Sequence, residues 1–401
     1  MKSSTIIGSA IVIVMAISVV YLVSSTNLLL PAKFKNRYSA FQNQPDRVEQ
    51  QQQLNDDDHV YMHDRNPDNK PLYDDALNLN YIAISEVASY KNLQVCLLYG
   101  KADLNGKKYV TLNYALKNKM VTLIETQDVN QLSLDNNSDQ YIYINSGDIV
   151  RGGQQDRTIQ YDVVIGPNEK GVDLASFCVE HGRWTPRGDE QVVCFSGSDN
   201  TVSSKELKIS TKYKKDQSEV WTNVEKYQDK TTHSINNGFI SPTADTISVK
   251  SEVSATSLEL TLDNDEIKKI ELTYRNSILK QLKKQPDVVG FAYFINGKLY
   301  SIDVFNNHKL FADLFNKLLD AAIAEAISMY DSKQKIVKAN SSDIVQLLPA
   351  NAKVYTDEDV NKNTRFLTSE HNIVQKVLIF TTIDKKEKSW IHRNWLDNSD
   401  N

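Results

Sequence analysis

The chain has 401 residues, of which 40% are apolar and 24% are charged, a balance that suits a globular domain with a large core and some appendages. Its formal net charge of −5 argues against a nucleic-acid partner, because phosphate binding needs a concentrated basic face. No block of lysine and arginine in the sequence supplies such a face.

Residues 1–30 predict a membrane anchor or an export signal. The apolar stretch that begins at Ile6 and ends at Val23 crosses most of a hydrocarbon layer of about 30 Å, and no cysteine follows it for lipid attachment. The small residues after it make a poor cleavage site, which favours a retained anchor over a cleaved peptide. Lys33, Lys35 and Arg37 would hold the domain in the cytoplasm by the positive-inside rule. A single amino-terminal apolar segment is more often an export device, so we expect an exported domain, periplasmic or extracellular, with the cytoplasmic orientation as the alternative.

Residues 31–75 predict a disordered polar tether. The stretch is low in aliphatic residues and contains a run of glutamines and a run of aspartates, so it buries too little apolar surface to offset the entropy of ordering. His59 and His63 lie near the aspartates, but solvated linker residues explain them better than a metal site. We expect neither a metal nor a cofactor.

Residues 76–395 predict a single α+β domain, and residues 396–401 a disordered tail. Strands are expected at residues 92–100 and 108–111, with a short helix at 111–119. Residues 140–149 alternate strictly, with tyrosines on one face and isoleucines on the other, which predicts one strand that ends near Gly147.

Two short segments rich in polar residues, which we call the polar bursts, then follow. The first is GDIVRGGQQDR from Gly147, and the second is FCVEHGRW up to Trp184. Strands are expected at 158–165 and 173–180, joined by a turn at 166–168. Gly152 and Gly153 predict a turn with positive φ where the backbone comes close to a ligand or another strand. If both turns are tight, the two bursts lie at opposite ends of the strand at 158–165. If the second burst continues past the end of the strand at 173–180, the two bursts can converge.

The second half predicts a mainly antiparallel sheet with helices packed on one face. Residues 195–204 predict a loop, 217–228 a helix and 231–246 an irregular excursion. A helix that starts with Asp263 and Glu266 ends before Pro286. Asn296-Gly297 predicts the turn of a hairpin. On its strands, we expect Gly290 to allow close packing and the Asp303 side chain to face away from its apolar neighbours, towards solvent or a polar site. A long helix at 307–330 and a last hairpin of residues 373–382 and 388–392 complete the expected elements.

The two bursts also carry a family resemblance. Gly152-Gly153-x-Gln155-Asp156-Arg157, the turn at Pro167, and Cys178-Val179-Glu180-x-Gly182-Arg183-Trp184 resemble the ARG and Rhodanese-Phosphatase-superfamily-associated domain. Supporting similarities are TLNYAL from Thr111 with Glu125 beyond it, the stretch from Gly290 to Phe305, Arg365-Phe366, and Ile391-His392. The resemblance covers roughly residues 71–395. This chain departs from the family pattern in carrying Asp156 where asparagine is common, and Gln375-Lys376 where a small residue is expected. The family is named for its gene neighbourhoods with ADP-ribosylglycohydrolases and rhodanese-type phosphatases, and the resemblance assigns it no activity.

The bursts contain the candidate site residues. Arginine forks and free backbone N–H groups suit phosphate or carboxylate, and a tryptophan can stack on a base or sugar. The candidate ligand-binding residues are Arg151, Gly152, Gly153, Gln155, Arg157, Arg183 and Trp184. Asp156 and Glu180 are the candidate acid and base of a hydrolase. His392 is a secondary candidate. Polar clusters of this composition are more often architectural, with buried ion pairs that fix strand register, and both interpretations stay open.

Three cysteines leave one unpaired whatever the arrangement. Cys178 and Cys194 have a spacing that allows a bridge across a hairpin but does not demand one, and buried thiols are the default for both and for Cys96. Motifs of the familiar metal, nucleotide and serine-hydrolase enzymes are not found in the sequence.

We therefore expect a membrane-tethered module that recognises an anionic small molecule or a protein partner at the cluster. The alternatives are a hydrolase of a phosphorylated or ADP-ribosyl substrate and a structural envelope protein. An enzyme needs an open pocket with a desolvated carboxyl, a binding module needs exposed arginines, and a structural protein should bury the cluster.

Overall fold

The computed structural model describes residues 82–188, 190, 193–241, 245–283, 286–348, 353–371 and 376–399. All of them lie in one compact unit, Pro71–Asn401. The predicted membrane segment, residues 1–30, and the predicted tether, residues 31–75, fall outside the described residues. Within the described ranges, no helix is both long enough and apolar enough to cross a membrane.

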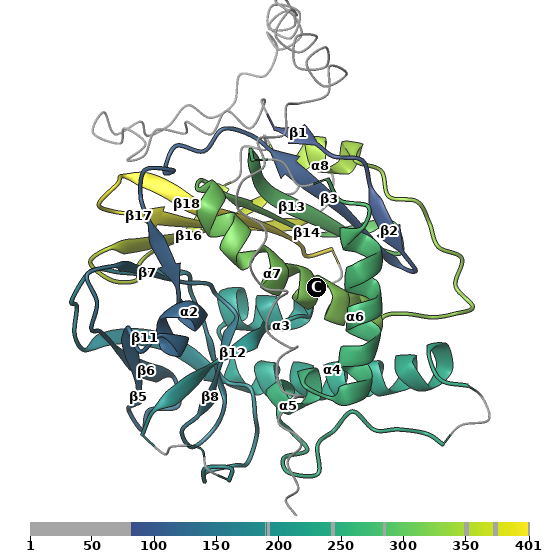
Figure 1. Ribbon diagram of the computed structural model, residues 1–401, viewed down its shortest axis with the longest axis horizontal. Helices are drawn as coiled ribbons and strands as arrows, with labels where there is room; N and C mark the ends of the chain where they lie inside the picture. Colours follow the sequence, from purple (N-terminus) through teal and green to yellow (C-terminus); the bar gives the residue numbers. More distant parts are fainter. Residues whose placement is uncertain are drawn as a thin grey trace, which may run out of the picture. The chain divides into compact units, whose positions relative to one another are not determined.

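An antiparallel sheet of nine strands is the largest element of the described chain (Figure 1). Its strands are β1 (Ala83–Ile84), β2 (Ala88–Tyr90), β3 (Leu93–Tyr99), β13 (Val288–Ile295), β14 (Lys298–Phe305), β15 (Lys353–Asp359), β16 (Thr364–His371), β17 (Val377–Asp384) and β18 (Ser389–Asp397). The order across the sheet is β1-β3-β13-β14-β18-β17-β16-β15, and β2 also pairs with β3. The carboxy-terminal hairpin β17–β18 therefore lies beside the central hairpin β13–β14, so the last strands belong to the same sheet as the first.

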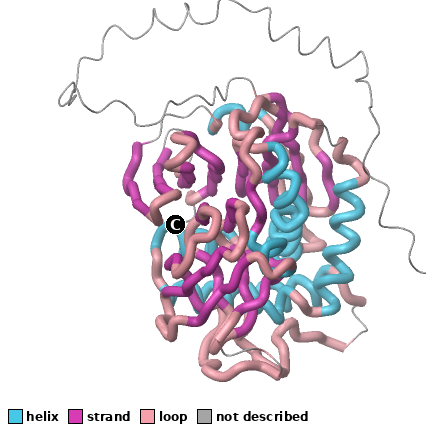
Figure 2. Tube along the Cα trace, turned by 60° about the vertical axis from the view of Figure 1, so that its left-hand side comes forward, coloured by secondary structure: helices cyan, strands magenta, loops and turns pink. Residues whose placement is uncertain are grey.

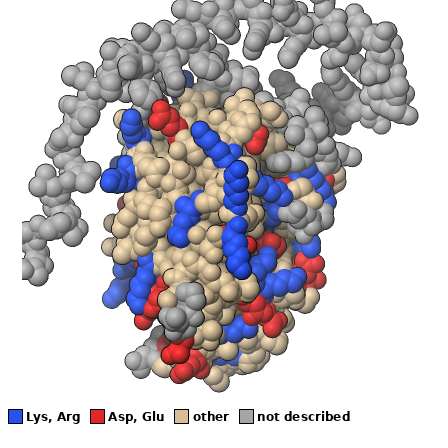
Figure 3. Space-filling view, turned by 90° about the vertical axis from the view of Figure 1, so that its right-hand side faces the viewer, with Lys and Arg blue, Asp and Glu red and all other residues tan. Residues whose placement is uncertain are grey.

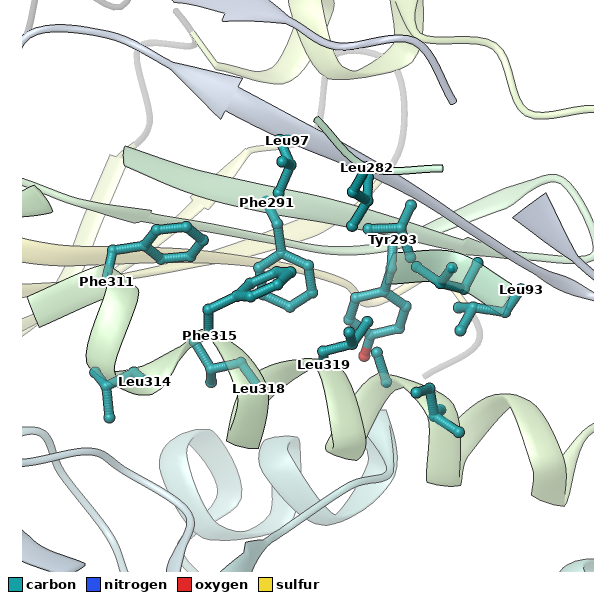
Figure 4. Close-up of a cluster of buried hydrophobic side chains, with 14 of the residues drawn as sticks. Leu93, Leu97, Leu282, Phe291, Tyr293, Phe311, Leu314, Phe315, Leu318 and Leu319 are labelled. Atoms are coloured by element: carbon teal, nitrogen blue, oxygen red, sulfur yellow. The ribbon is translucent and has the colours of Figure 1, made fainter. Parts of the chain in front are cut away.

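Two helices, α6 (Asp265–Leu279) and α7 (His308–Ser328), cover one face of this sheet. Figure 4 shows Phe311 and Phe315 of α7 facing Phe291 and Tyr293 of β13. The apolar stripe that predicted α7 is the stripe that packs here, because residues three and four apart share one face of a helix. The short helix α8 (Ser342–Leu347) packs on the opposite face of the sheet, so the helices do not lie on one face alone.

Two smaller sheets form the part of the domain that holds both polar bursts. One sheet has the order β10-β7-β4, with strands β4 (Tyr109–Thr111), β7 (Tyr141–Ile144) and β10 (Val163–Ile165). The other has the order β12-β8-β9-β11-β6-β5, with strands β5 (Val121–Glu125), β6 (Gln131–Asn136), β8 (Asp148–Gly152), β9 (Arg157–Ile159), β11 (Val172–Cys178) and β12 (Phe195–Thr201). The pairing of β4 with β7 is parallel, and helix α2 (Leu112–Lys117) follows β4 as predicted.

One kinked hairpin joins these two sheets. The sequence predicts single strands at 140–149 and 158–165, but each is broken into two, β7 and β8 on one arm and β9 and β10 on the other. The register is the same on both sides of the break, since Ile144 pairs with Val163 and Ile149 with Thr158. At the break the carboxylate of Asp162 accepts the backbone N–H of Ser146 at 2.7 Å. A side-chain bond thus replaces ladder bonds there, which alternation of apolar residues does not reveal.

The remaining described helices are α3 (Lys205–Ile209), the π-helix η2 (Ser210–Lys214), α4 (Gln217–Gly238) and α5 (Leu258–Leu262). In Figure 2 most of the helices form one cyan group beside the magenta strands. Two predictions are wrong in this region. The expected loop at 195–204 contains β12, and the helix expected to end near residue 228 continues through the first half of the predicted excursion to Gly238.

The predicted ends of two elements also shift. The first turn of α6 is capped by Asn264 rather than by Asp263, because the Asn264 side chain accepts the N–H groups of Glu266 and Ile267. Strand β18 continues through Asp397, past the domain end predicted at residue 395, and Leu396 is fully buried. The ordered chain therefore includes at least part of the predicted disordered tail.

The hairpin between β13 and β14 confirms a prediction from two residues. Asn296 has φ 52° and Gly297 has φ 82°, the left-handed pair that a two-residue hairpin turn requires. Gly290 on β13 has the close packing that we expected, because an added Cβ would overlap the backbone of Asp303 and Val304 on β14.

Replacing Gly290 with alanine should therefore lower the free energy of unfolding by about 1–3 kcal/mol, because two central strands must separate to admit the methyl group. Chemical denaturation measures this change. Gly106→Ala is the control, since a Cβ at Gly106 would meet nothing within 4 Å. Equal stability of the two variants would contradict the close approach.

Candidate functional site

The tip of the kinked hairpin places the first polar burst. Residues 153–156 connect β8 to β9, and Gly152 and Gly153 have φ 119° and 57°, so the predicted positive-φ turn is present. A Cβ on Gly153 would collide with the ring of Phe195 and the carboxylate of Glu125. The close approach that the glycines predict is therefore made to the protein's own strands.

The second burst lies directly beside the first. Strand β11 runs antiparallel to β9, with Cys178 opposite Arg157, so the residues after β11 lie next to the residues before β9. The backbone N–H of Val179 donates to the carbonyl of Asp156 at 3.0 Å, and the N–H of Asp156 donates to Glu180 Oε2 at 3.2 Å. The bursts converge because the end of the third strand and the start of the second lie at the same end of an antiparallel sheet.

Asp156 and Glu180 share two arginines. Arg187 Nη2 donates to Asp156 Oδ1 at 2.6 Å, and its Nη1 lies 3.7 Å from Glu180 Oε1. Arg183 Nε lies 2.7 Å from Glu180 Oε2, and its Nη2 lies 3.7 Å from Asp156 Oδ1. Glu190 completes the group through both of its oxygens on Arg187. We call these five residues the arginine cluster.

The two central carboxylates of the arginine cluster are sealed from solvent. Asp156 and Glu180 are both 0% exposed, and the side chains of Arg183 and Arg187 are 9% and 8% exposed. Ser257 donates to Asp156 Oδ2 at 3.1 Å, and Ser254 donates to Glu180. Burial raises the pKa of Asp156 above its ordinary value, although Arg187 and Arg183 lower it. The two buried carboxylates are thus paired and hydrogen-bonded, whereas Nε and Nη2 of Arg183 contribute ion pairs without a hydrogen bond.

The other predicted site residues belong to neighbouring groups. Arg157 is fully buried and bonds to Glu125, to the Val129 carbonyl and, at 2.6 Å, to Cys178 Sγ. The Arg151 side chain lies in a different ion-pair group, with Nη1 3.2 Å from Asp263 Oδ2 and Nε 3.7 Å from Glu259 Oε1. Gln155 is 1% exposed. The structure therefore brings together Asp156, Glu180 and Arg183, as the sequence predicts, but it places Arg151 and Arg157 in separate ion pairs. It also adds Arg187, which the sequence prediction missed.

Trp184 is the exposed member of the predicted site. It is 52% exposed, although it lies between Arg183 and Arg187, whose side chains point into the arginine cluster. Nearby on the same segment, the ring of exposed His181 lies edge-on to Trp221 at 4.4 Å between centroids. We call residues 181–188 the tryptophan loop.

The cysteines are free thiols. Cys178 and Cys194 form no disulfide, and Cys178 and Cys96 are buried while Cys194 is partly exposed. Burial raises the pKa of the Cys178 thiol to about 11, and Arg157 only partly offsets this effect. At neutral pH the thiol stays protonated, as a packing residue would.

A second buried cluster, which we call the histidine cluster, lies where the kink meets the large sheet. His392 of β18 has Nδ1 2.7 Å from Asp162 Oδ2 and Nε2 3.1 Å from Asp303 Oδ1. Asn394 donates to Asp303 at 3.0 Å, and Lys212 of η2 donates to Asn394 at 3.2 Å. As the sequence predicts, Asp303 faces away from its apolar neighbours and towards a polar group. Both nitrogens of His392 are engaged, so in this arrangement neither is left to exchange a proton with a ligand.

The charges of the histidine cluster support one another. Burial lowers the pKa of His392, but the two carboxylates more than offset it and hold the pKa above its ordinary value. Burial raises the pKa of Asp162 and Asp303, but His392, together with Lys212 and other polar neighbours, more than reverses this effect in both. The ring of His392 also stacks on Phe305 with centroids 4.0 Å apart. The cluster is an aspartate–histidine–aspartate bridge between the kink and two central strands, and the raised pKa of His392 favours its charged form.

Nothing in the described residues gathers three or more histidine, cysteine or acidic side chains as a metal site would. His59 and His63 lie outside the described residues.

The fold and these two clusters define an α+β domain of mainly antiparallel sheets that contains buried ion-pair networks. Residues 81–396 match the family model described as the ARG and Rhodanese-Phosphatase-superfamily-associated Protein domain, ARPP-1. The match covers well over half of the chain, and the chain belongs to this family, as the resemblance in the sequence indicated. No curated protein and no solved structure matches the chain.

Proposed function

We propose that this chain is a membrane-tethered recognition module that binds a protein partner over the tryptophan loop. One observation carries the proposal: Trp184 is 52% exposed on a loop whose two arginines are anchored in fully buried carboxylates. A large aromatic side chain held on a rigid support loses little entropy on binding, and tryptophan is enriched among the residues that dominate binding energy. The buried cluster then serves as the brace of the loop.

A free anionic ligand fits the charges less well than a protein partner. The four arginines around the hairpin tip, Arg151, Arg157, Arg183 and Arg187, face six carboxylates, namely Glu125, Asp156, Glu180, Glu190, Glu259 and Asp263. The formal charge of these ten side chains is therefore −2, although burial raises the pKa of Glu259 to about 7 and Lys268 lies 3.8 Å from Asp263. Each guanidinium already pairs with a carboxylate. A phosphate would have to displace a protein carboxylate from an arginine, against its repulsion by the carboxylates that remain.

Support for the membrane tether comes from the sequence alone. Residues 6–23 are apolar and residues 31–75 are polar and low in aliphatics, which supports a membrane anchor followed by a linker. We propose that the domain is exported, since a single amino-terminal apolar segment usually directs export. A reporter fused after Asn401 that is active only outside the cytoplasm tests this orientation, and activity of a cytoplasmic reporter alone would reverse it.

The hydrolase alternative requires the arginine cluster to open. Asp156 has the raised pKa of a general acid, and Glu180 lies beside it. Both carboxylates are fully buried and lie within ion-pair distance of the same two arginines, so a substrate would have to displace Arg183 and Arg187 before it reached them. An envelope protein without a ligand is the remaining alternative, and it would leave Trp184 without a role.

Photo-crosslinking from the tryptophan loop tests the proposed function. A photoreactive phenylalanine analogue at position 184 of the full chain, expressed in the producing cell, should give one discrete adduct with a partner protein. The matched control places the same analogue at Val253, which is 73% exposed. An identical adduct pattern from both positions, or no adduct from position 184, would contradict the proposal. Trp184→Ala should abolish binding of the partner so identified and change the free energy of unfolding by less than about 0.5 kcal/mol.

A further inference from the structure

The loop that leads from α7 to α8 exposes aliphatic side chains among lysines. Residues 331–338, which we call the basic loop, are exposed along their whole length. Ile336 and Val337 are 44% and 58% exposed, and Lys333, Lys335 and Lys338 flank them. Among the described residues, no carboxylate lies within ion-pair distance of these three lysines.

This exposure is a feature of a well-anchored loop. Gln94 on β3 donates from Nε2 to the Val337 carbonyl at 2.8 Å and accepts the Ala339 N–H at 2.6 Å. Val337 also lies against the β13–β14 turn, where a Cβ on Gly297 would meet it at 2.7 Å. The sheet thus holds the basic loop across the ends of its strands, with Ile336 turned to solvent.

The turns beside the basic loop add positive charge. Lys91 lies between β2 and β3, and its Nζ donates to Tyr330 Oη, next to the start of the loop, at 3.2 Å. Lys298 begins β14, is 39% exposed and pairs with the buried Asp397. These five lysines, with Asp331 and Asp397, have a summed formal charge of +3, and Lys205 also pairs with Asp397. The loop runs down the right-hand side of Figure 1, and Figure 3 shows Lys and Arg side chains spread over that side.

We propose that the basic loop docks on the surface of an anionic phospholipid bilayer, with Ile336 and Val337 at the boundary of headgroups and acyl chains and the lysines at the phosphates. Aliphatic residues flanked by lysines combine the two attractions that hold peripheral segments on membranes. Each lysine near an anionic surface strengthens binding by about fivefold.

The choice of a lipid surface as the partner rests on the proposed function, in which the domain is tethered to a membrane. A polar linker of the length of residues 31–75 has a root-mean-square span of roughly 35–40 Å. The domain then stays close to its own bilayer, and docking becomes an intramolecular step that weak contacts can sustain. This favours a lipid surface over an acidic protein as the occupant.

Quenching by brominated lipids tests the docking surface in the full chain. Tryptophan is introduced as Ile336→Trp, and Val253→Trp is the matched exposed control. Each chain is reconstituted into vesicles of phosphatidylcholine with or without about 30% phosphatidylglycerol. About one anionic lipid in three gives the vesicle a strongly anionic surface. The quenching of the four native tryptophans, measured in the unsubstituted chain, is subtracted from both. We then expect brominated lipid to quench the tryptophan at 336 several-fold more than that at 253, only when phosphatidylglycerol is present. The triple variant Lys333→Gln/Lys335→Gln/Lys338→Gln, made in the Ile336→Trp chain, should lose most of this quenching.

Flotation separates the two ways in which the experiment can fail. If the chain floats with pure phosphatidylcholine vesicles but position 336 is quenched no more than position 253, the tether stands and the docking surface is overturned. If the chain floats only with phosphatidylglycerol and the triple lysine variant does not, the docking surface stands and the tether is overturned. Flotation with neither vesicle overturns both.

Discussion

Arg187→Ala should lower the free energy of unfolding by about 3 kcal/mol, which is the order of the cost of leaving a buried charge uncompensated. Arg187 donates to Asp156 at 2.6 Å and lies 3.7 Å from Glu180, and both carboxylates are fully buried. After the substitution only Arg183 faces the two negative charges. Chemical denaturation at neutral pH measures the loss.

Two further variants separate this effect from a general loss of surface charge. Lys117→Ala breaks an ion pair with Asp199 whose side chains are 58% and 79% exposed, and such pairs contribute at most about 1 kcal/mol. Adding Asp156→Asn to Arg187→Ala should recover part of the lost stability, because a neutral amide removes the uncompensated charge. A double variant as unstable as the sum of the two single variants would show that the charges are not coupled.

The loss in Arg187→Ala should also shrink at low pH. Burial already raises the pKa of Asp156 above 3.8, and removal of Arg187 raises it further. A carboxyl with a raised folded pKa binds its proton more tightly in the folded state, so stability falls as pH rises from 3.8 through the folded pKa. The variant should therefore approach the wild type as the pH is lowered towards that range.

His392→Ala should be of similar severity, with a loss of about 3–5 kcal/mol, because it leaves two buried aspartates without their shared cation. The imidazole lies 2.7 Å from Asp162 and 3.1 Å from Asp303, and it stacks on Phe305. Thermal or chemical unfolding of the variant measures the loss. His233→Ala is the control, since His233 is exposed on α4 and its removal should change stability by less than about 0.5 kcal/mol.

The pH dependence of stability identifies the charge on His392. Its pKa is raised above 6.5, so its contribution is fully present below pH 6.5 and is lost as pH rises through the folded pKa. The wild type should lose stability above pH 6.5, and His392→Ala should lack this loss. An identical slope in both proteins would mean that the bridge is not charged.

Much of the candidate site follows from the sequence because it depends on local chemistry. The positive φ of Gly152 and Gly153 and the polar residues around them mark the hairpin tip. The convergence of Asp156 with Glu180 follows from antiparallel pairing once strands β9 and β11 are assigned. Arg187 has no such signal, because it belongs to an irregular segment and only the folded chain brings it to Asp156. The same is true of Asp162 and His392, which are 230 residues apart in the sequence.

The errors in the predicted fold have similar causes. Residues 195–204 are rich in serine, aspartate and asparagine, yet β12 forms because its backbone pairs with β8, and tertiary pairing overrides weak β-propensity. The apolar alternation at 140–149 did not show the break between β7 and β8, where Asp162 bonds to Ser146. Only Gly147, which has φ 88° and lies in the break, marked its place in the sequence. By contrast, the stripe of α7 and the turn at Asn296-Gly297 were predictable, because each depends on residues within a few positions of one another.

The central claim is that the arginine cluster braces the tryptophan loop while Trp184 is free to bind. The most direct test compares the unfolding free energies of Arg187→Ala and Trp184→Ala under identical conditions. We predict a loss of about 3 kcal/mol for the first and less than about 0.5 kcal/mol for the second. An Arg187→Ala protein as stable as the wild type would contradict the brace and return the arginines to the list of candidate ligand-binding residues.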